Sequence, residues 1–288
     1  MDIHVAYRAQ DILGEGPVWV PEEQTLYWVD IQAPALQRWQ PGSGAYHRWP
    51  LPSEIGSFGL RQNGGALVAL RTGFAFLDLE TGSMSPLLDP EADQPYTRFN
   101  DGKCDRSGRF WAGTMDEENP NTRGALYRLD PSGDCQIMQA GIGISNGLGW
   151  SPDNRIMYYT DSIKHQIYAY DFDLQSGTIR NRRVFAETPQ EYVPDGLAVD
   201  AEGHIWSAKW DGWKVVRYAP DGSVDSEIEL PVQRPTSCTF GGPELKHLYI
   251  TSARDGLTAQ ELARQPEAGN IFVLETFTHG LPEPRFGG

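Results

Sequence analysis

The chain has 288 residues, of which 24 are basic and 39 acidic, so its formal net charge is −15 at pH 7. This excess of negative charge repels phosphate backbones and anionic lipid headgroups, which argues against nucleic-acid and membrane partners. No apolar run approaches the roughly 20 residues of a membrane span, and the N-terminus lacks a basic segment followed by an apolar one, so we expect a cytoplasmic location.

The composition favours strands over helices. With 31 Gly, 21 Pro, 9 Trp, 12 Tyr and 11 Phe, the chain suits short strands joined by tight turns. Its three cysteines have no C-x-x-C spacing, which indicates free buried thiols rather than disulfides or a thiolate zinc site. Nothing in the sequence indicates a protein partner.

A repeat of 40 to 50 residues, a period typical of propellers, runs along the chain. Six Gly-containing or apolar segments each lead into a polar turn, and a strand rich in β-formers follows. In chain order these segments are 16–19, 58–61, 101–104, 147–150, 196–199 and 238–241, and the strands after the turns are 26–29, 66–70, 110–112, 156–159, 205–208 and 248–251. The sequence therefore contains six similar units.

Most units continue with a third strand and a weaker fourth one. The third strands are 36–39, 74–77, 126–129, 167–170 and 215–218, and examples of the fourth are 47–49 and 183–185. Four antiparallel strands per unit make a propeller blade. We predict an all-β fold, a six-bladed β-propeller that occupies residues 1–288 as one domain.

The sixth unit, residues 237–274, lacks an outer strand of its own. Residues 3–7 can supply it, which would close the ring and remove an exposed edge. Thr258 and Glu261 form a capping-box pattern that predicts a short helical turn ahead of residue 264. We expect residues 276–288 to be a loose tail.

One register of the repeat carries small or oxygen-bearing side chains. They are Glu15, Ser57, Asn100, Asn146, Asp195 and Ser237, at spacings of 42, 43, 46, 49 and 42 residues. In a propeller the first strand of every blade lines the channel and all first strands run the same way. These six side chains should therefore face a common centre at one end of the channel.

Two carboxylates of this ring, Glu15 and Asp195, would repel each other by about 4 kcal/mol at roughly 4 Å and an effective dielectric near 20. A divalent cation between them removes that cost, and Asn146 adds a third oxygen. Oxygen ligands suit calcium, magnesium or manganese, and carboxylates also bind zinc. The alternative is that each residue accepts a backbone hydrogen bond in a polar turn at a strand end.

Longer segments of the chain resemble the SMP-30/gluconolactonase/regucalcin-like family over nearly the whole length. They are residues 13–19, 98–103, 108–115, 144–148, 194–196 and 264–269. The resemblance implies one divalent cation on Glu15, Asn146 and Asp195. Calcium or zinc are its first candidates, followed by magnesium, manganese or iron.

The same resemblance implies hydrolysis of a small sugar lactone to the open aldonic acid. Asp195 would be the general base as well as a metal ligand, and Arg98, Asn100 and Glu118 would contact the substrate. The alternative is a non-enzymatic, calcium-binding, regucalcin-like protein. The loop 115–123 should shape the pocket, and Trp206, Trp210 or Trp213 could stack on a sugar if they are not part of the core.

A different class of enzyme is suggested by residues 143–147, which match the G-x-S-x-G pattern of serine hydrolases. That pattern requires a strand before the serine and a helix after it. The residues after Ser145 read as strand, turn and strand instead. We therefore expect Ser145 to be a residue at a strand entry and not a nucleophile.

Overall fold

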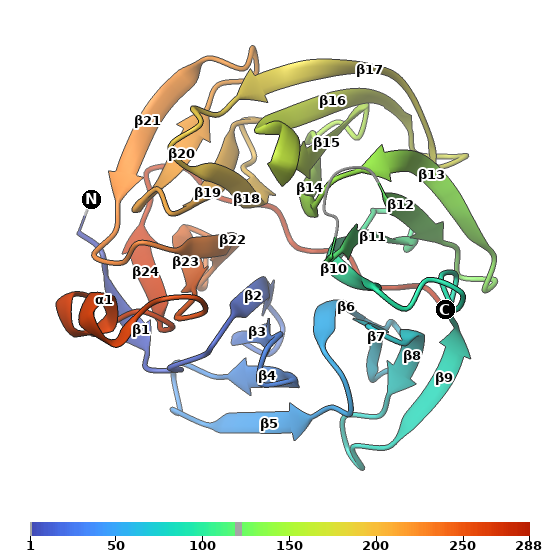
Figure 1. Cartoon of the computed structure of the whole chain (residues 1–288), viewed down its shortest axis with the longest axis horizontal. Helices are drawn as coiled ribbons and strands as arrows, with labels where there is room; N and C mark the ends of the chain where they lie inside the picture. Colours follow the sequence, from blue (N-terminus) through green and yellow to red (C-terminus); the bar gives the residue numbers. More distant parts are fainter. Residues whose placement is uncertain (1, 119–122) are drawn as a thin grey trace.

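The computed structural model describes residues 2–118 and 123–288, which form six four-stranded antiparallel sheets around a central channel (Figure 1). The predicted six-bladed β-propeller is confirmed. The innermost strands are β2 (Gly14–Val20), β6 (Ile55–Leu60), β10 (Thr97–Cys104), β14 (Ser145–Trp150), β18 (Val193–Val199) and β22 (Pro235–Gly241).

The other strands follow outward in sequence order in five blades, and in the sixth blade the outer strand is β1. The second strands are β3 (Thr25–Asp30), β7 (Ala66–Leu70), β11 (Phe110–Asp116), β15 (Ile156–Asp161), β19 (Ile205–Trp210) and β23 (His247–Ser252). The third are β4 (Ala35–Trp39), β8 (Gly73–Leu77), β12 (Gly124–Leu129), β16 (Gln166–Asp173), β20 (Lys214–Tyr218) and β24 (Ile271–Glu275). The outer ones are β5 (Tyr46–Pro50), β9 (Met84–Leu88), β13 (Cys135–Ile142), β17 (Thr178–Glu187), β21 (Val224–Glu229) and β1 (His4–Tyr7).

The ring closes as predicted, because β1 is the outer strand of the sixth sheet and pairs antiparallel with β24. Within residues 2–118 and 123–288, two short helices interrupt the strands, η1 (Ser162–Lys164) and α1 (Ala259–Arg264). The capping box at α1 is confirmed, since the Thr258 side chain accepts the backbone N–H of Glu261 and the Glu261 side chain accepts that of Thr258. No helix among the described residues is both long and apolar enough to cross a bilayer.

The expectation of a loose C-terminal tail is wrong. These last residues run from the sixth blade across the ring (Figure 1), and Phe286 is only 1% exposed. The Phe286 backbone N–H donates to Leu60 O at 2.8 Å, Gly287 N–H donates to Gly108 O at 2.9 Å, and Lys103 Nζ lies 3.1 Å from Glu283 Oε1. The tail therefore covers the end of the channel where the innermost strands finish.

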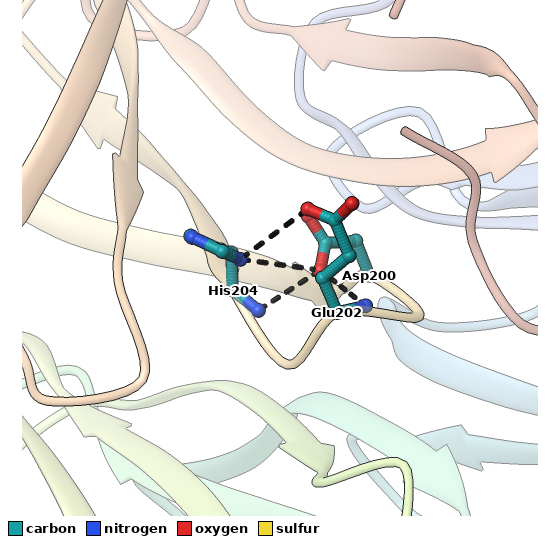
Figure 2. Close-up of side chains that lie close together, drawn as sticks. All are labelled: Asp200, Glu202 and His204. Carbon is teal, nitrogen blue, oxygen red and sulfur yellow. Dashed lines mark hydrogen bonds and ion pairs between the residues drawn. The ribbon is translucent and has the colours of Figure 1, made fainter. Parts of the chain in front are cut away.

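A turn with a buried aspartate connects the first two strands of the fifth blade (Figure 2). Asp200 Oδ1 accepts the N–H groups of Glu202 and His204 at 3.0 and 2.9 Å. Its Oδ2 accepts Trp206 Nε1 at 3.0 Å and Arg217 Nη2 at 2.8 Å. The Asp-x-x-Gly pattern, which occurs at 105–108 and 200–203, thus places a carboxylate that accepts hydrogen bonds both from backbone N–H groups of the turn and from a side chain of the second strand.

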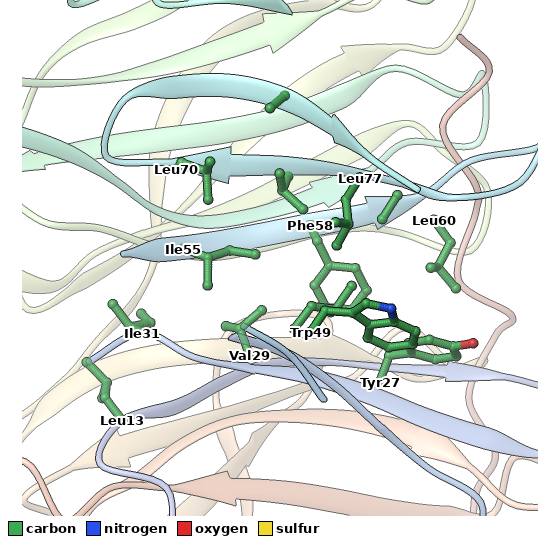
Figure 3. Packing of buried hydrophobic residues seen from close by; sticks show 14 of the residues in the cluster. Leu13, Tyr27, Val29, Ile31, Trp49, Ile55, Phe58, Leu60, Leu70 and Leu77 are labelled. Atoms are coloured by element: carbon green, nitrogen blue, oxygen red, sulfur yellow. The ribbon is translucent and has the colours of Figure 1, made fainter. Parts of the chain in front are cut away.

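The core lies between the blades as well as within them. Figure 3 shows the contact between the first and second blades, where Tyr27 and Val29 of β3 face Ile55 and Phe58 of β6 in one buried cluster. Trp49 of the outer strand joins this cluster, and its Nε1 donates to Leu79 O at 3.1 Å. Both faces of the second strands β3 and β7 are buried, which explains their nearly continuous apolar sequences.

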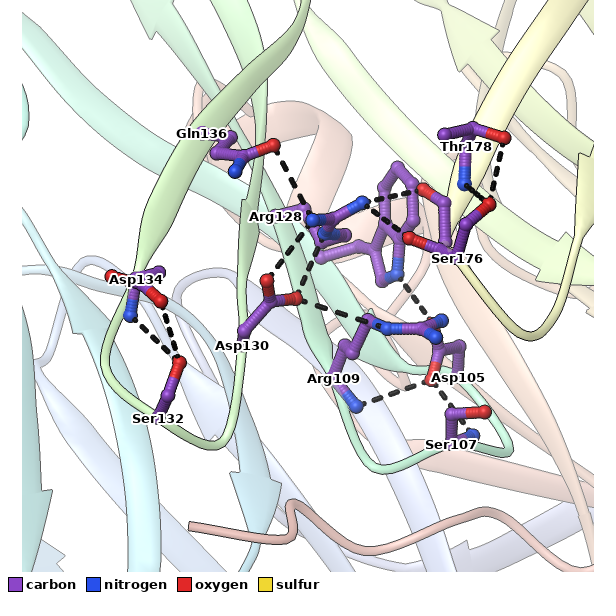
Figure 4. A network of polar contacts seen from close by, with 12 residues as sticks. Asp105, Ser107, Arg109, Arg128, Asp130, Ser132, Asp134, Gln136, Ser176 and Thr178 are labelled. Atoms are coloured by element: carbon purple, nitrogen blue, oxygen red, sulfur yellow. Dashed lines mark hydrogen bonds and ion pairs between the residues drawn. The ribbon is translucent and has the colours of Figure 1, made fainter.

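The third blade repeats the turn seen in the fifth (Figure 4). Asp105 Oδ2 accepts Arg109 Nη1 at 2.7 Å and Trp111 Nε1 at 3.0 Å. Arg109 Nη2 and Arg128 Nη1 then reach carbonyl oxygens of the β16–β17 turn, at Leu174 (2.7 Å) and Gly177 (2.7 Å) respectively. Charged side chains at one blade's turn therefore fix the neighbouring blade in place.

Candidate functional site

Every innermost strand has an irregularity at the level of its ring residue. The antiparallel pairing shifts register between Glu15 and Val18, Ile55 and Ser57, Phe99 and Gly102, Asn146 and Leu148, Pro194 and Leu197, and Pro235 and Cys238. A β-bulge bends the strand and redirects a side chain. Each ring residue therefore lies at or beside a bulge at the same level of its blade.

A cavity of about 280 Å³ opens at this level. The ring residues that line it are Glu15, Asn100, Asn146 and Asp195, and Arg98 joins them. Ser57 and Ser237 are not among its described lining residues. The remaining wall is mainly apolar and is formed by Leu13, Ile31, Met115, Ile144, Ile163, Val193 and Trp210, with Ser162, His165 and Asp255 as further polar members.

The cavity brings together five of the six residues that the sequence analysis selected. The sixth, Glu118, is exposed and is not among the described lining residues; its backbone N–H donates to Asp116 Oδ1 at 2.9 Å. Its neighbour Glu117 contacts the site instead, with Oε1 3.0 Å from Arg98 Nε. Within the predicted pocket loop 115–123, Met115 lines the cavity, and residues 119–122 lie outside the described residues.

Burial and mutual repulsion dominate the electrostatics of the ring. Removal from water raises the pKa of Glu15 well above its usual value, and the charges of Asp195 and Asp101 raise it further. The pKa of Asp195 is raised in the same way, by burial first and then by Asp101. Two buried carboxylates at one site are therefore unfavourable as anions unless a positive charge lies between them.

Three features of the ring fit a divalent cation. Asn146 Oδ1 and Asp195 Oδ1 are both buried, and neither has a hydrogen-bond partner among the described residues. Glu15 Oε2 accepts the N–H of Gly16 at 3.0 Å, so the other carboxylate oxygen stays available. Unpartnered buried oxygens are rare in folded proteins, and a carboxylate, carboxylate and amide set matches the ligands of hard cations.

Arg98 and Asn100 are held in one orientation beside the ring. Arg98 Nη1 donates to Asn100 Oδ1 at 2.8 Å, and Asn100 Nδ2 donates to the carbonyl oxygen of Ser145 at 2.8 Å. Glu117 bridges Arg98 to Arg71, whose Nη2 lies 2.6 Å from Glu117 Oε2. The arginine head is thus fixed next to the cavity before any ligand arrives, which lowers the entropic cost of binding.

Sequence reasoning did not single out Asp101, a buried carboxylate next to the site that is not among the described residues lining the cavity. It lies on β10 beside the ring, burial raises its pKa to about 6, and its Oδ1 accepts the N–H of Gly102 at 2.7 Å. A signal was present, because Asp101-Gly102 repeats the acid-glycine pair of Glu15-Gly16 and Asp195-Gly196. The third buried carboxylate is offset by Lys103, which forms an ion pair with Glu283 of the C-terminal segment.

The three tryptophans considered from the sequence lie in different environments. Trp206 is fully buried in the core of the fifth blade, and Trp213 is 41% exposed on the surface. Trp210 alone of the three lines the cavity. The Arg234 guanidinium carbon lies 4.6 Å from its ring centroid, and Arg234 Nε binds Asp211 Oδ1 at 2.6 Å, so the indole is held firmly.

The serine-hydrolase pattern has no matching structure. Ser145 begins β14, which turns into β15 as a hairpin, and its hydroxyl accepts a hydrogen bond from the Tyr159 hydroxyl at 2.7 Å.

A second group of residues with the side chains of a metal site, Asp200, Glu202 and His204, has its possible ligand atoms within 4.8 Å of one another, but an arginine already neutralises its charge. Arg217 supplies positive charge there, with Nη2 at 2.8 Å from Asp200 and 3.0 Å from Glu202.

The close approach of neighbouring inner strands depends on glycines that follow the ring residues. A Cβ on Gly196 would overlap Oγ and Cβ of Ser237 in the next blade, and one on Gly147 would lie 2.6 Å from the Asp195 carbonyl oxygen. The innermost strands of neighbouring blades can therefore approach this closely only because these positions have no side chain.

We expect Gly196→Ala to destabilise the protein by about 1–3 kcal/mol, because the added methyl group overpacks the strand contact. Replacement of Ser237 by Gly in the same chain should recover part of that loss, since it removes the overlapping side-chain atoms. Gly147→Ala should show no such recovery, because its contacts are with backbone atoms. Urea unfolding of these variants, each with and without the Ser237 replacement, checks this, and equal losses for Gly196→Ala in both backgrounds would contradict it.

The fold and the cavity first define a class of protein, namely six-bladed propellers with an axial cavity that is lined by buried carboxylate and amide side chains and by apolar residues. More particularly, the chain belongs to the SMP-30/gluconolactonase/LRE-like family, whose model matches residues 13–254. The resemblance noted from the sequence is confirmed.

Similar proteins carry more than one name. The chain is 43% identical over 283 residues to a 6-deoxy-6-sulfogluconolactonase of Pseudomonas putida, covering 98% of this chain and 97% of that protein. It is 40% identical to regucalcin of Oryctolagus cuniculus, covering 96% and 95%. A solved structure of a calcium-binding regucalcin from Agrobacterium tumefaciens superposes with a TM-score of 0.92 at 30% identity, covering 98% and 97%.

Proposed function

We propose that this protein is a metal-dependent lactonase that opens a small sugar lactone to the aldonic acid. The observation that carries the proposal is the pair of unpartnered buried oxygens, on Asn146 and Asp195, in a cavity shared with Glu15. Family membership and the similarity to a sulfogluconolactonase support the choice of reaction. Glu15, Asn146 and Asp195 would hold one divalent cation, with calcium and zinc as the first candidates.

The cation would supply Lewis acidity, which polarises a carbonyl group or lowers the pKa of water. The chain supplies the remaining functions. Asp195 has one unpartnered oxygen that can accept a proton from water at the cavity floor. Arg98 and Asn100 are fixed at the wall, where they can donate hydrogen bonds to sugar hydroxyls or to the developing oxyanion. Trp210 offers a rigid aromatic wall for a sugar face.

We expect hydrolysis of pentono- and hexono-lactones by metal-loaded protein, and only the buffer rate after chelation. The panel should include 6-deoxy-6-sulfogluconolactone, because the similar Pseudomonas protein carries that name. Released acid is measured by a pH indicator, and calcium, zinc, magnesium, manganese and iron are restored one at a time. Equal rates for loaded and chelated protein on every lactone would contradict the proposal.

A calcium-binding role without catalysis is the second candidate, favoured by the similarity to regucalcins. It predicts that calcium binds tightly and that no lactone of the panel is opened. The lactone panel, together with a measurement of calcium binding, therefore separates the two candidates. Both require the ring to bind a cation, and only the lactonase requires turnover.

A further inference from the structure

Ser162 lies between two of the residues assigned to the cation. It is the first residue of η1, directly after β15, and is 2% exposed at the cavity wall. Its hydroxyl donates to the Pro194 carbonyl oxygen at 2.7 Å and accepts from Asn146 Nδ2 at 3.1 Å. Since Pro194 directly precedes Asp195, this hydroxyl connects the strands that carry Asn146 and Asp195.

The direction of these two hydrogen bonds is fixed by the chemistry of the partners. A serine hydroxyl has one proton, and a carbonyl oxygen can only accept. The proton therefore points at Pro194, and only a lone pair of Ser162 Oγ remains for Asn146. The Asn146 amide must turn its NH₂ group toward the serine, so its Oδ1 does not face the serine and is left for another partner.

Asn146 Oδ1 and Asp195 Oδ1 are both buried without a hydrogen-bond partner among the described residues, and both residues line the cavity. An amide rotated by half a turn would place two oxygens against each other at Ser162 and would point the positive end of the NH₂ dipole at a cation. Both contacts are unfavourable, so the serine selects one orientation of the amide.

We propose that Ser162 is a positioning residue that makes Asn146 present its oxygen, and not its NH₂ group, to a divalent cation. This inference rests on the metal site of the proposed function and does not depend on lactone hydrolysis. Ligand-orienting partners of this kind typically contribute 10- to 100-fold to metal affinity.

The first test is cation affinity without substrate. Ser162→Ala should weaken the binding of calcium or zinc by about 10- to 100-fold, measured by calorimetric competition with a chelator of known affinity. Ser162→Cys keeps the shape but has a thiol, which is a much weaker donor to Pro194 and a much weaker acceptor from Asn146. It should weaken binding in the same direction, so it replaces the alanine variant if that variant folds poorly. Unchanged affinity in both variants would overturn the inference.

The second test separates orientation from general structural damage. Asn146→Asp has oxygen at both terminal positions, so its ligand set does not depend on which way the group is turned. In the Asn146→Asp background, Ser162→Ala should lower the cation affinity by less than about threefold, which is below the loss expected when a ligand-orienting partner is removed. An equal loss with and without the Asn146→Asp change would mean that Ser162 acts only structurally, and would overturn the inference. Wild-type protein that binds no divalent cation would overturn the proposed function together with it.

Discussion

Asp195→Asn should lower the turnover of the preferred sugar lactone by about 10²- to 10⁴-fold at saturating metal, the range expected when a general base is lost. The asparagine keeps the size of the side chain but lacks the negative charge and the proton-accepting oxygen. Turnover is measured as initial rates over a range of metal concentrations, with metal content determined for each sample, so that weaker metal binding is not mistaken for loss of the base.

The matched control is Asp101→Asn, which makes the same chemical change at another buried carboxylate of the channel. Asp101 Oδ1 is satisfied by Gly102, and Asp101 is not among the described residues that line the cavity. We expect this variant to keep its rate within about tenfold, below the range for loss of a base. Near-normal turnover of Asp195→Asn at saturating metal would place the general base elsewhere.

Phe286→Ala should reduce the free energy of unfolding by about 3–5 kcal/mol, as expected for a fully buried aromatic side chain. Phe286 packs with Phe76 and the core of the third blade, and its backbone is bound to Leu60 and Gln62. The loss combines the buried apolar area with the cavity that remains, because strands on either side restrict relaxation.

Phe277→Ala is the control for this change, since Phe277 lies in the same segment and is 66% exposed. It should change the free energy of unfolding by no more than about 0.5 kcal/mol. Urea unfolding followed by tryptophan fluorescence gives both values. A loss for Phe286→Ala as small as that for Phe277→Ala would show that packing of the Phe286 ring contributes little to stability.

The architecture was predictable because each blade repeats the same local signals. Polar turns with a glycine separate short strands of β-branched and aromatic residues, and the turn aspartates at Asp105 and Asp200 sit at the same place in their blades. Equal spacing then places equivalent residues at one level of the channel. Glu15, Asn146 and Asp195 could be brought together on this ground before any contact was known.

Other features depend on contacts that no local pattern reports. Glu117 and not Glu118 reaches Arg98, because successive side chains point in opposite directions and the strand becomes irregular after Asp116. The C-terminal segment has the proline and glycine content of a flexible tail, yet Phe286 is buried by residues of the second and third blades, far earlier in the chain. Ser162 gave no signal at all, since its role follows from the direction of two hydrogen bonds.

The sixth blade has a consequence for the order of assembly. The other five sheets each use consecutive strands, whereas the sixth combines β1 with β22, β23 and β24. During synthesis five blades can form while the first strand still waits for a partner at the opposite end of the sequence. Until the sixth blade is synthesised, the ring of blades stays open between the first and fifth blades. Glu15, in the first blade, is therefore enclosed in a complete ring only when the last blade has formed.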